Sequence, residues 1–276
     1  MDFLGIGAQR SGSSWLDAVL REHSAFWLPP IKELHYFDRL ADGPWQRLTG
    51  NQDSYRLARE ALRRGGPAWR WHARYLLGRR SDAWYLSLFE PGAGRLRGEI
   101  TPRYSILPEE GIAHVARLLP EVRILYLLRD PVERAWSNLR RGADRYGTPA
   151  SWGEGDLRAR LERSGVLTMG SYAQILARWE RHLPAERILV ACFEEIAEDP
   201  AGLLRRIGRF LGVGEGGPPP ASLRATVNAE RPAPLPPRLR ALLAQHYLLD
   251  LRALHARLAS PYTAAWLAAA EESGAT

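Results

Sequence analysis

The sequence is short of the residues that several kinds of site require. It contains one cysteine, Cys192, among 276 residues, which excludes an intramolecular disulfide and any metal site built from several cysteines. A reducing compartment, the cytoplasm, is therefore the expected location. No window of about eighteen residues is apolar throughout, and the apolar run 3–6 begins after two residues, so we expect neither a signal peptide nor a membrane span.

Lysine is almost absent as well. Of the 38 basic residues only Lys32 is lysine, and the others are arginines that mostly alternate with leucine and alanine. Such scattered charge is typical of solvated helix faces, and the wealth of Arg, Ala, Gly and Pro indicates a coding bias of the kind expected in bacteria. The formal net charge of +7 favours an anionic ligand without saying which one. We expect no nucleic acid partner, and a basic anion-binding module stays open as a non-enzymatic alternative.

Short apolar runs alternate with helix-compatible stretches along most of the chain. This order predicts an α/β fold with a mainly parallel central sheet flanked by helices. We expect a single domain over 1–276, with a loop and helices over 213–276. The expected strands are 3–7, 25–28, 96–100, 123–128 and 187–191, and the expected terminal helices are 238–257 and 263–270.

Residues 41–95 interrupt this rhythm with aromatic side chains among arginines. The aromatic residues are Trp45, Trp69, Trp71, Tyr75, Trp84, Tyr85 and Phe89. We expect a helical insertion after the second strand. Its aromatic side chains either line an acceptor site or simply pack the insertion onto the sheet, and the composition alone leaves both interpretations open.

The loop after the first expected strand suits an anion. A strand ending at Gly7, a glycine-containing loop and a helix beginning near Ser13 present backbone N–H groups at a positive helix end. The spacing from Gly7 to Gly12 matches that of triphosphate-binding loops, but Ser13 stands where those loops require lysine. A P-loop nucleotide-dependent kinase or hydrolase therefore loses support, and it stays open only as an alternative function. The alternative without any ligand is a tight turn between strand and helix, with serines that cap the helix.

A second boundary between a strand and a helix carries another cation. Asp130 is expected to cap a helix beginning at Pro131, and Glu133 completes a capping-box pattern. Arg129 then lies at the carboxyl end of a central strand, where open α/β sheets bind ligands, and Ser137 follows about two helical turns later. Both side chains can reach one phosphate, and a local ion pair of Arg129 is the alternative.

Both boundaries resemble motifs of one family. The run from Gly7 to Trp15, GAQRSGSSW, resembles the 5'-phosphosulfate loop of the sulfotransferases that use 3'-phosphoadenosine 5'-phosphosulfate (PAPS), and the RDP run with its later serine resembles their 3'-phosphate motif. The resemblance spans roughly residues 3–212. It implies a P-loop-like fold, PAPS as the sulfuryl donor and no metal. The cofactor contacts that it implies are Gln9, Arg10, Ser11, Gly12, Ser13, Ser14, Trp15, Arg129, Ser137 and, from the run GSY, Tyr172.

The sequence departs from the family pattern at two positions. Arg10 stands where the family usually has lysine, and arginine is a wider and permanently charged fork. Ile100 stands where a lysine commonly helps at the reaction centre. Lys32 and Arg103 are the candidates to replace that missing cation.

Sulfuryl transfer to a neutral hydroxyl needs a group that removes the proton. The segment 33–37, ELHYF, resembles the E-x-x-F-F-type segment of the carbohydrate-modifying branch, in which the glutamate is the general base. Glu33 is thus the expected base and His35 the second choice, with Arg10 and Lys32 supplying charge. The expected acceptor is a hydroxyl, or less favourably an amine, of a small molecule or glycan: a carbohydrate, a lipid or a secondary metabolite. No oligomeric state is indicated.

Overall fold

The computed structural model describes residues 1–40, 59–60, 63, 65, 67–141, 161, 165–214, 219–224 and 234–274. Within these ranges five strands form one parallel sheet in the order β2-β3-β1-β4-β5. The predicted α/β class and the parallel sheet are confirmed. The strands are β1 (Phe3–Gly7), β2 (Phe26–Trp27), β3 (Leu96–Ile100), β4 (Arg123–Leu128) and β5 (Ile188–Cys192). Strands β1, β3 and β4 have the predicted bounds, β2 is shorter, and β5 begins and ends one residue later than expected.

Both faces of the sheet are buried, which explains why its strands are apolar along most of their length. On β4, Ile124, Tyr126 and Leu128 face one apolar cluster. Leu125 and Leu127 alternate with them and face the other cluster, as the two-residue period of a strand requires. The sheet is therefore the middle layer of three.

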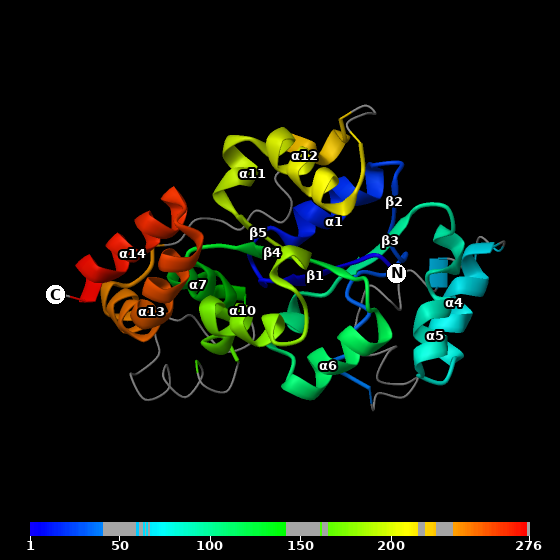
Figure 1. The fold of residues 1–276 in the computed structure, drawn as a ribbon, viewed down its shortest axis with the longest axis horizontal. Helices are drawn as coiled ribbons and strands as arrows, with labels where there is room; N and C mark the ends of the chain where they lie inside the picture. Colours follow the sequence, from blue (N-terminus) through cyan, green and yellow to red (C-terminus); the bar gives the residue numbers. More distant parts are fainter. Residues whose placement is uncertain are drawn as a thin grey trace.

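Helices cover the two faces unequally (Figure 1). One face carries α1 (Ser13–Glu22), α11 (Glu194–Glu198) and α12 (Pro200–Leu211). The other face carries α4 (Pro67–Leu77), α5 (Asp82–Ser87), α6 (Glu109–Leu118), α7 (Pro131–Arg141) and α10 (Tyr172–Glu180). The helices α13 (Pro237–Leu258) and α14 (Pro261–Gly274) form a hairpin, and α13 packs on α7 and α10. No helix in the described ranges has the length and apolarity that a membrane crossing requires.

The described part of the predicted insertion is helical, as expected. Its side chains Trp71, Tyr75, Trp84, Tyr85 and Phe89 are buried in the apolar cluster that also contains strand residues. The packing interpretation therefore holds for these five aromatic residues. Trp69 is 42% exposed, and Trp45 lies outside the described residues.

The start of α7 confirms the predicted cap. The Asp130 Oδ1 atom accepts hydrogen bonds from the backbone N–H groups of Val132 and Glu133, at 2.8 and 3.4 Å. The Glu133 carboxylate does not complete a capping box but accepts a hydrogen bond from Arg240 of α13, at 2.7 Å. This contact ties the C-terminal hairpin to the helix that carries Ser137.

Replacing Asp130 by alanine is expected to lower the free energy of unfolding by about 1 kcal/mol, because the first turn of α7 loses the side-chain acceptor of its N–H groups. Asn at position 130 keeps an acceptor oxygen and should retain most of the stability. Urea unfolding of the three proteins measures both differences. Equal loss in Asp130→Ala and Asp130→Asn would show that the negative charge, and not the cap, matters.

Candidate active site

The loop between β1 and α1 leaves the start of α1 open to an anion. Gly12 occupies the N-cap position with φ 90° and, having no side chain, offers no cap to the first helical turn. A Cβ atom at Gly12 would lie 2.3 Å from the Ile196 Cδ1 atom, so the turn requires glycine. The first N–H groups of a helix have no acceptor within the helix. A phosphate or sulfate at this end would supply one.

The ends of β1 and β4 bring the two predicted anion motifs together. The Arg10 Nε atom donates to the Ser137 Oγ atom at 3.0 Å. Arg129 Nη1 donates to the carbonyl oxygen of Arg10 at 3.4 Å, and its guanidinium lies over the Phe193 ring at 4.9 Å. Thus two guanidinium groups and a hydroxyl surround one region at the carboxyl edge of the sheet.

Lys32 lies at the N-terminal end of α1. Its Nζ atom donates to the hydroxyl oxygens of Ser13 and Ser14, at 3.4 and 3.2 Å. The same ammonium is 3.8 Å from the Glu33 Oε1 atom. The one lysine of the chain therefore joins the predicted sulfuryl-binding serines to the predicted base.

Glu33, His35 and Asp38 form a chain of contacts. The His35 Nε2 atom is 3.5 Å from the Glu33 carboxylate, and its Nδ1 atom is 2.8 Å from Asp38 Oδ2. Glu33 and His35 both adopt left-handed backbone conformations, with φ of 59° and 52°. Such conformations cost energy in residues other than glycine and persist only where their surroundings enforce them.

The electrostatics of this group separate the two candidate bases. Burial by itself raises the pKa of Glu33, but the hydrogen bond from His35 and the charge of Lys32 outweigh it and lower the pKa below its ordinary value. Burial lowers the pKa of His35, whereas its contacts with Asp38 and Glu33 outweigh this and raise the pKa to about 9. At neutral pH Glu33 is therefore an ionised carboxylate and His35 an imidazolium, which cannot accept a proton.

Several residues predicted to contact a cofactor are buried or hydrogen-bonded within the protein. Ser11 and Tyr172 have no exposed surface, and the Tyr172 hydroxyl donates to the carbonyl oxygen of Arg129 at 2.8 Å. Trp15 is buried, and its indole N–H donates to the Leu223 carbonyl at 3.0 Å. The Gln9 side chain accepts a hydrogen bond from Asn138 at 2.7 Å. These contacts hold the loop and Arg129 in place.

The structure also locates the two candidates for the missing cation. Ile100 packs in the apolar cluster beneath α1, where a Cβ atom at Gly5 would meet it at 2.8 Å. The Arg103 Nε atom lies 3.7 Å from the Asp38 carboxylate, whereas Lys32 contacts both serines. Lys32 is thus the better placed of the two.

Sequence reasoning missed Asp38, Glu99 and Asn138. Asp38 follows His35 by three residues, and Asn138 follows Ser137 directly, so proximity to a predicted residue was their only signal. Glu99 is a carboxylate near the carboxyl end of a predicted strand, directly before Ile100, and a buried charge is uncommon enough to be a signal of its own. In the described ranges no group of three or more His, Cys, Asp or Glu side chains is arranged to hold a metal ion.

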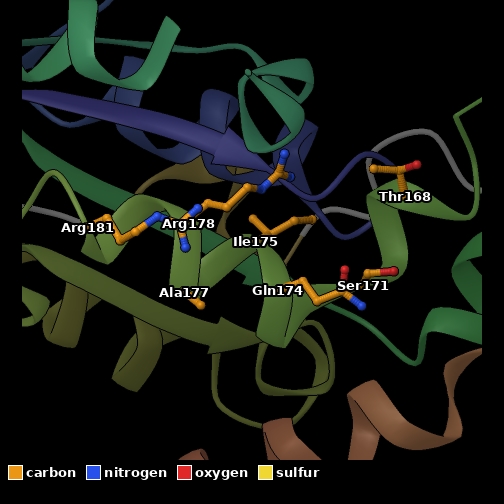
Figure 2. Close-up of a pocket in the computed structure, with 7 residues that line it drawn as sticks. All are labelled: Thr168, Ser171, Gln174, Ile175, Ala177, Arg178 and Arg181. Carbon is orange, nitrogen blue, oxygen red and sulfur yellow. The ribbon is translucent and has the colours of Figure 1, made fainter. Parts of the chain in front are cut away.

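A hollow of about 340 Å³ lies elsewhere, beside α10 and the residues just before it (Figure 2). None of the predicted site residues lines it. Tyr172, on the same helix, is buried and contacts Arg129. The side chains around the hollow are Thr168, Ser171, Gln174, Ile175, Ala177, Arg178 and Arg181.

Comparison with known sequences identifies related proteins. A family profile described as the sulfotransferase family matches residues 3–214. Heparan sulfate glucosamine 3-O-sulfotransferase 3B1 of Mus musculus is 31% identical over 137 residues, which are 48% of this chain and 35% of that relative. Bifunctional heparan sulfate N-deacetylase/N-sulfotransferase 1 of Xenopus tropicalis is 29% identical over 135 residues, which are 45% of this chain and 14% of that relative. The chain thus spans only a minor part of these curated relatives.

Solved structures show the same fold. A sulfotransferase from Alicyclobacillus acidocaldarius superposes with a TM-score of 0.70 at 24% identity, and the alignment covers 96% of this chain and 98% of that protein. The sulfotransferase domain of the Synechococcus PCC 7002 olefin synthase has a TM-score of 0.58 at 19% identity, covering 82% of this chain and 78% of its own. At these identities the likeness concerns the fold.

The raised pKa of His35 predicts a pH-dependent contribution to stability. The contribution is fully present below the ordinary pKa of 6.5 and is lost as the pH rises through about 9. At its fullest it amounts to about 3 kcal/mol. The difference in unfolding free energy between the wild type and His35→Gln, measured in urea, should shrink from pH 6 to pH 10. A difference that stays constant over this range would show that His35 is not held as an imidazolium.

Proposed function

The chain belongs to the sulfotransferase family, and from this premise we propose that it is an enzyme that transfers the sulfuryl group of PAPS to a hydroxyl group of a carbohydrate. The observation that carries the proposal is the position of Lys32 between Ser13, Ser14 and Glu33. Through Lys32, the carboxylate of Glu33 is one contact away from the N-terminal start of α1, where an anionic group would bind.

The residues present fit a nucleotide that is charged at both ends. The uncapped start of α1, with Ser13 and Ser14, offers donors for the 5'-phosphosulfate. Arg129 and Ser137 offer a guanidinium and a hydroxyl for the 3'-phosphate. Arg10 contacts Ser137 and lies on the loop between these places, so its charge supports the binding of both ends.

The proposed reaction is a direct in-line displacement. When bound, PAPS supplies the sulfuryl group, whose bond to the bridging oxygen of the phosphate breaks as the acceptor oxygen bonds to sulfur. Glu33 takes the proton of the acceptor hydroxyl. Lys32, Ser13 and Ser14 stabilise the negative charge on the transferring group and the leaving oxygen, which is the same positioning and charge stabilisation that phosphoryl transfer uses. Adenosine 3',5'-bisphosphate and a sulfate ester are the products.

Two observations support Glu33 over His35 as the base. Contacts with Asp38 and Glu33 raise the pKa of His35 to about 9, so its ring carries a proton at neutral pH. The charge of this ring and of Lys32 lowers the pKa of Glu33, which keeps the carboxylate ionised and ready to accept a proton. The proposed role of His35 is therefore to orient and ionise Glu33.

A carbohydrate is the favoured acceptor because the curated relatives are named for heparan sulfate and because segment 33–37 resembles that of the carbohydrate-modifying branch. The test is a screen with PAPS labelled in its sulfuryl group, offered glucosamine-containing oligosaccharides, glycolipids and phenolic metabolites. Label in the oligosaccharides supports the proposal. Label confined to lipids or phenols would correct the acceptor class while retaining the reaction.

Adenosine 3',5'-bisphosphate is expected to raise the melting temperature in a saturable manner, because it binds the folded state alone. Arg129→Ala should weaken its binding about 10- to 100-fold, toward that of adenosine 5'-monophosphate, since the guanidinium of Arg129 is assigned to the 3'-phosphate. Arg181→Ala, in the hollow of Figure 2, is the matched control and should bind like the wild type. Stronger stabilisation by ATP with magnesium would favour the kinase or hydrolase alternative.

Replacing Glu33 by glutamine is expected to lower kcat by about 10²- to 10⁴-fold, because the amide cannot accept the acceptor proton. Binding of adenosine 3',5'-bisphosphate should be unchanged. Glu186→Gln makes the same chemical change on the exposed turn before β5, at the opposite edge of the sheet, and should leave transfer intact. A fully active Glu33→Gln enzyme would refute the assignment of the base.

A further inference from the structure

Glu99 is a buried carboxylate in the sheet. It lies on β3, next to β1 in the register that pairs it with Leu4, and only 2% of its surface is exposed. Because side chains alternate along a strand, Ile100 enters the apolar cluster beneath α1, and Glu99 points to the opposite face. A buried carboxylate is costly unless its oxygens are fully hydrogen-bonded.

Four donors surround this carboxylate. The Oε1 atom accepts from the Tyr85 and Tyr104 hydroxyls, at 2.6 and 2.9 Å. The Oε2 atom accepts from the Thr101 hydroxyl at 2.7 Å and from the backbone N–H of Leu34 at 3.1 Å. Four donors fill the acceptor positions of an ionised carboxylate. Burial raises the pKa of Glu99, and the hydrogen bonds from Thr101, Tyr85 and Tyr104 act against that rise.

These bonds reach the segment that carries the proposed base. Leu34 stands between Glu33 and His35, both of which have left-handed backbones. The Tyr104 hydroxyl, which donates to Glu99, accepts a hydrogen bond from the backbone N–H of Tyr36 at 2.8 Å. The Tyr36 ring in turn stacks on the ring of Tyr85 at 4.4 Å. Glu99 thus holds the backbone of Leu34 directly and the backbone of Tyr36 through the hydroxyl of Tyr104.

We propose that Glu99 is a positioning residue for sulfuryl transfer: its carboxylate fixes the backbone around Leu34 so that Glu33 meets Lys32 and His35. The proposal rests on the function proposed above for Glu33. It accounts for two left-handed residues in one short segment, because the hydrogen bonds to Leu34 and Tyr36 fix the backbone next to each of them. Glu99 touches neither the reacting atoms nor the proposed donor site, and it acts through the segment 33–37.

Hydrogen exchange tests the positioning role without any acceptor. In Glu99→Gln the amide presents an N–H₂ group to neighbours that are themselves donors, so the N–H groups of Leu34 and Tyr36 should lose protection. Exchange in the peptide spanning 33–37 should be about tenfold faster or more, with the peptide spanning 8–16 unchanged. Glu195→Gln is the matched control, because the Glu195 carboxylate caps the Cys192 N–H at 2.7 Å and not this segment. Unchanged exchange in 33–37 would overturn the proposal.

Kinetics provide a readout that a loss of stability alone would not move. A displaced Glu33 loses the charges of Lys32 and His35 and that of nearby Arg141, so its pKa returns upward. The acid limb of kcat against pH, for transfer to a glucosamine-containing oligosaccharide, should therefore move to higher pH in Glu99→Gln. We expect kcat to fall at least tenfold, with KM for PAPS within about twofold of the wild type. A variant with normal kcat and an unmoved acid limb would contradict the positioning role.

A milder variant covers the case in which Glu99→Gln does not fold. Tyr104→Phe removes the hydroxyl that links Glu99 to the N–H of Tyr36 and leaves the carboxylate with its other donors. It should increase exchange in 33–37 and shift the acid limb in the same direction by a smaller amount. If no transfer is seen even in the wild type, the proposed function fails, while the exchange experiment still decides whether Glu99 holds the segment.

Discussion

The parallel pairing of β1 with β4 holds the elements on which the candidate site depends. The register sets Gly7 beside Tyr126, and the Ala8 N–H continues the ladder to the carbonyl of Leu127 at 2.5 Å. Because parallel strands end at the same edge, the loop after Gly7 and the helix after Arg129 start side by side. The chain leaves β1 toward β2 and leaves β4 toward β5, on opposite sides of this pair, and such a change of direction is where open α/β sheets bind ligands. The contact of Arg10 with Ser137 is a direct consequence.

The distribution of cations at this edge follows from the shape of each side chain. A compact ammonium on a flexible stem fits between Ser13, Ser14 and Glu33, and Lys32 occupies that place. A guanidinium is wide and planar, and Arg10 uses it to reach across to α7. In the proposed reaction this division separates a charge close to the sulfuryl group from charges that hold the nucleotide. The lone lysine of an arginine-rich chain thus stands where one ammonium contacts two hydroxyls and a carboxylate.

The parts of the fold that follow local patterns were predictable. Apolar runs and helical periodicity gave the α/β class, the bounds of β1, β3 and β4 and the helical character of the insertion, because these patterns reflect the faces that must be buried. The Asp130 cap was predictable because capping involves residues close in the sequence. The predicted capping-box role of Glu133 was wrong: its carboxylate accepts a hydrogen bond from Arg240, which is more than a hundred residues away in the sequence. The family resemblance also implied cofactor contacts for Tyr172 and Trp15; both side chains are buried, and their contact with a cofactor stays a prediction.

Taken alone, the sequence determined the fold class and predicted two anion sites, since a glycine loop before a helix and an arginine after a strand are local features read from neighbouring residues. It also indicated Glu33 as a base through its resemblance to a known segment. Only the tertiary structure decided that His35 is cationic, since its charge depends on Asp38 and Glu33 meeting its ring. The backbone of Glu33 likewise depends on Glu99, which lies 65 residues from Leu34 along the chain. Hydrogen bonds across such separations leave no local pattern, because folding alone brings their partners together.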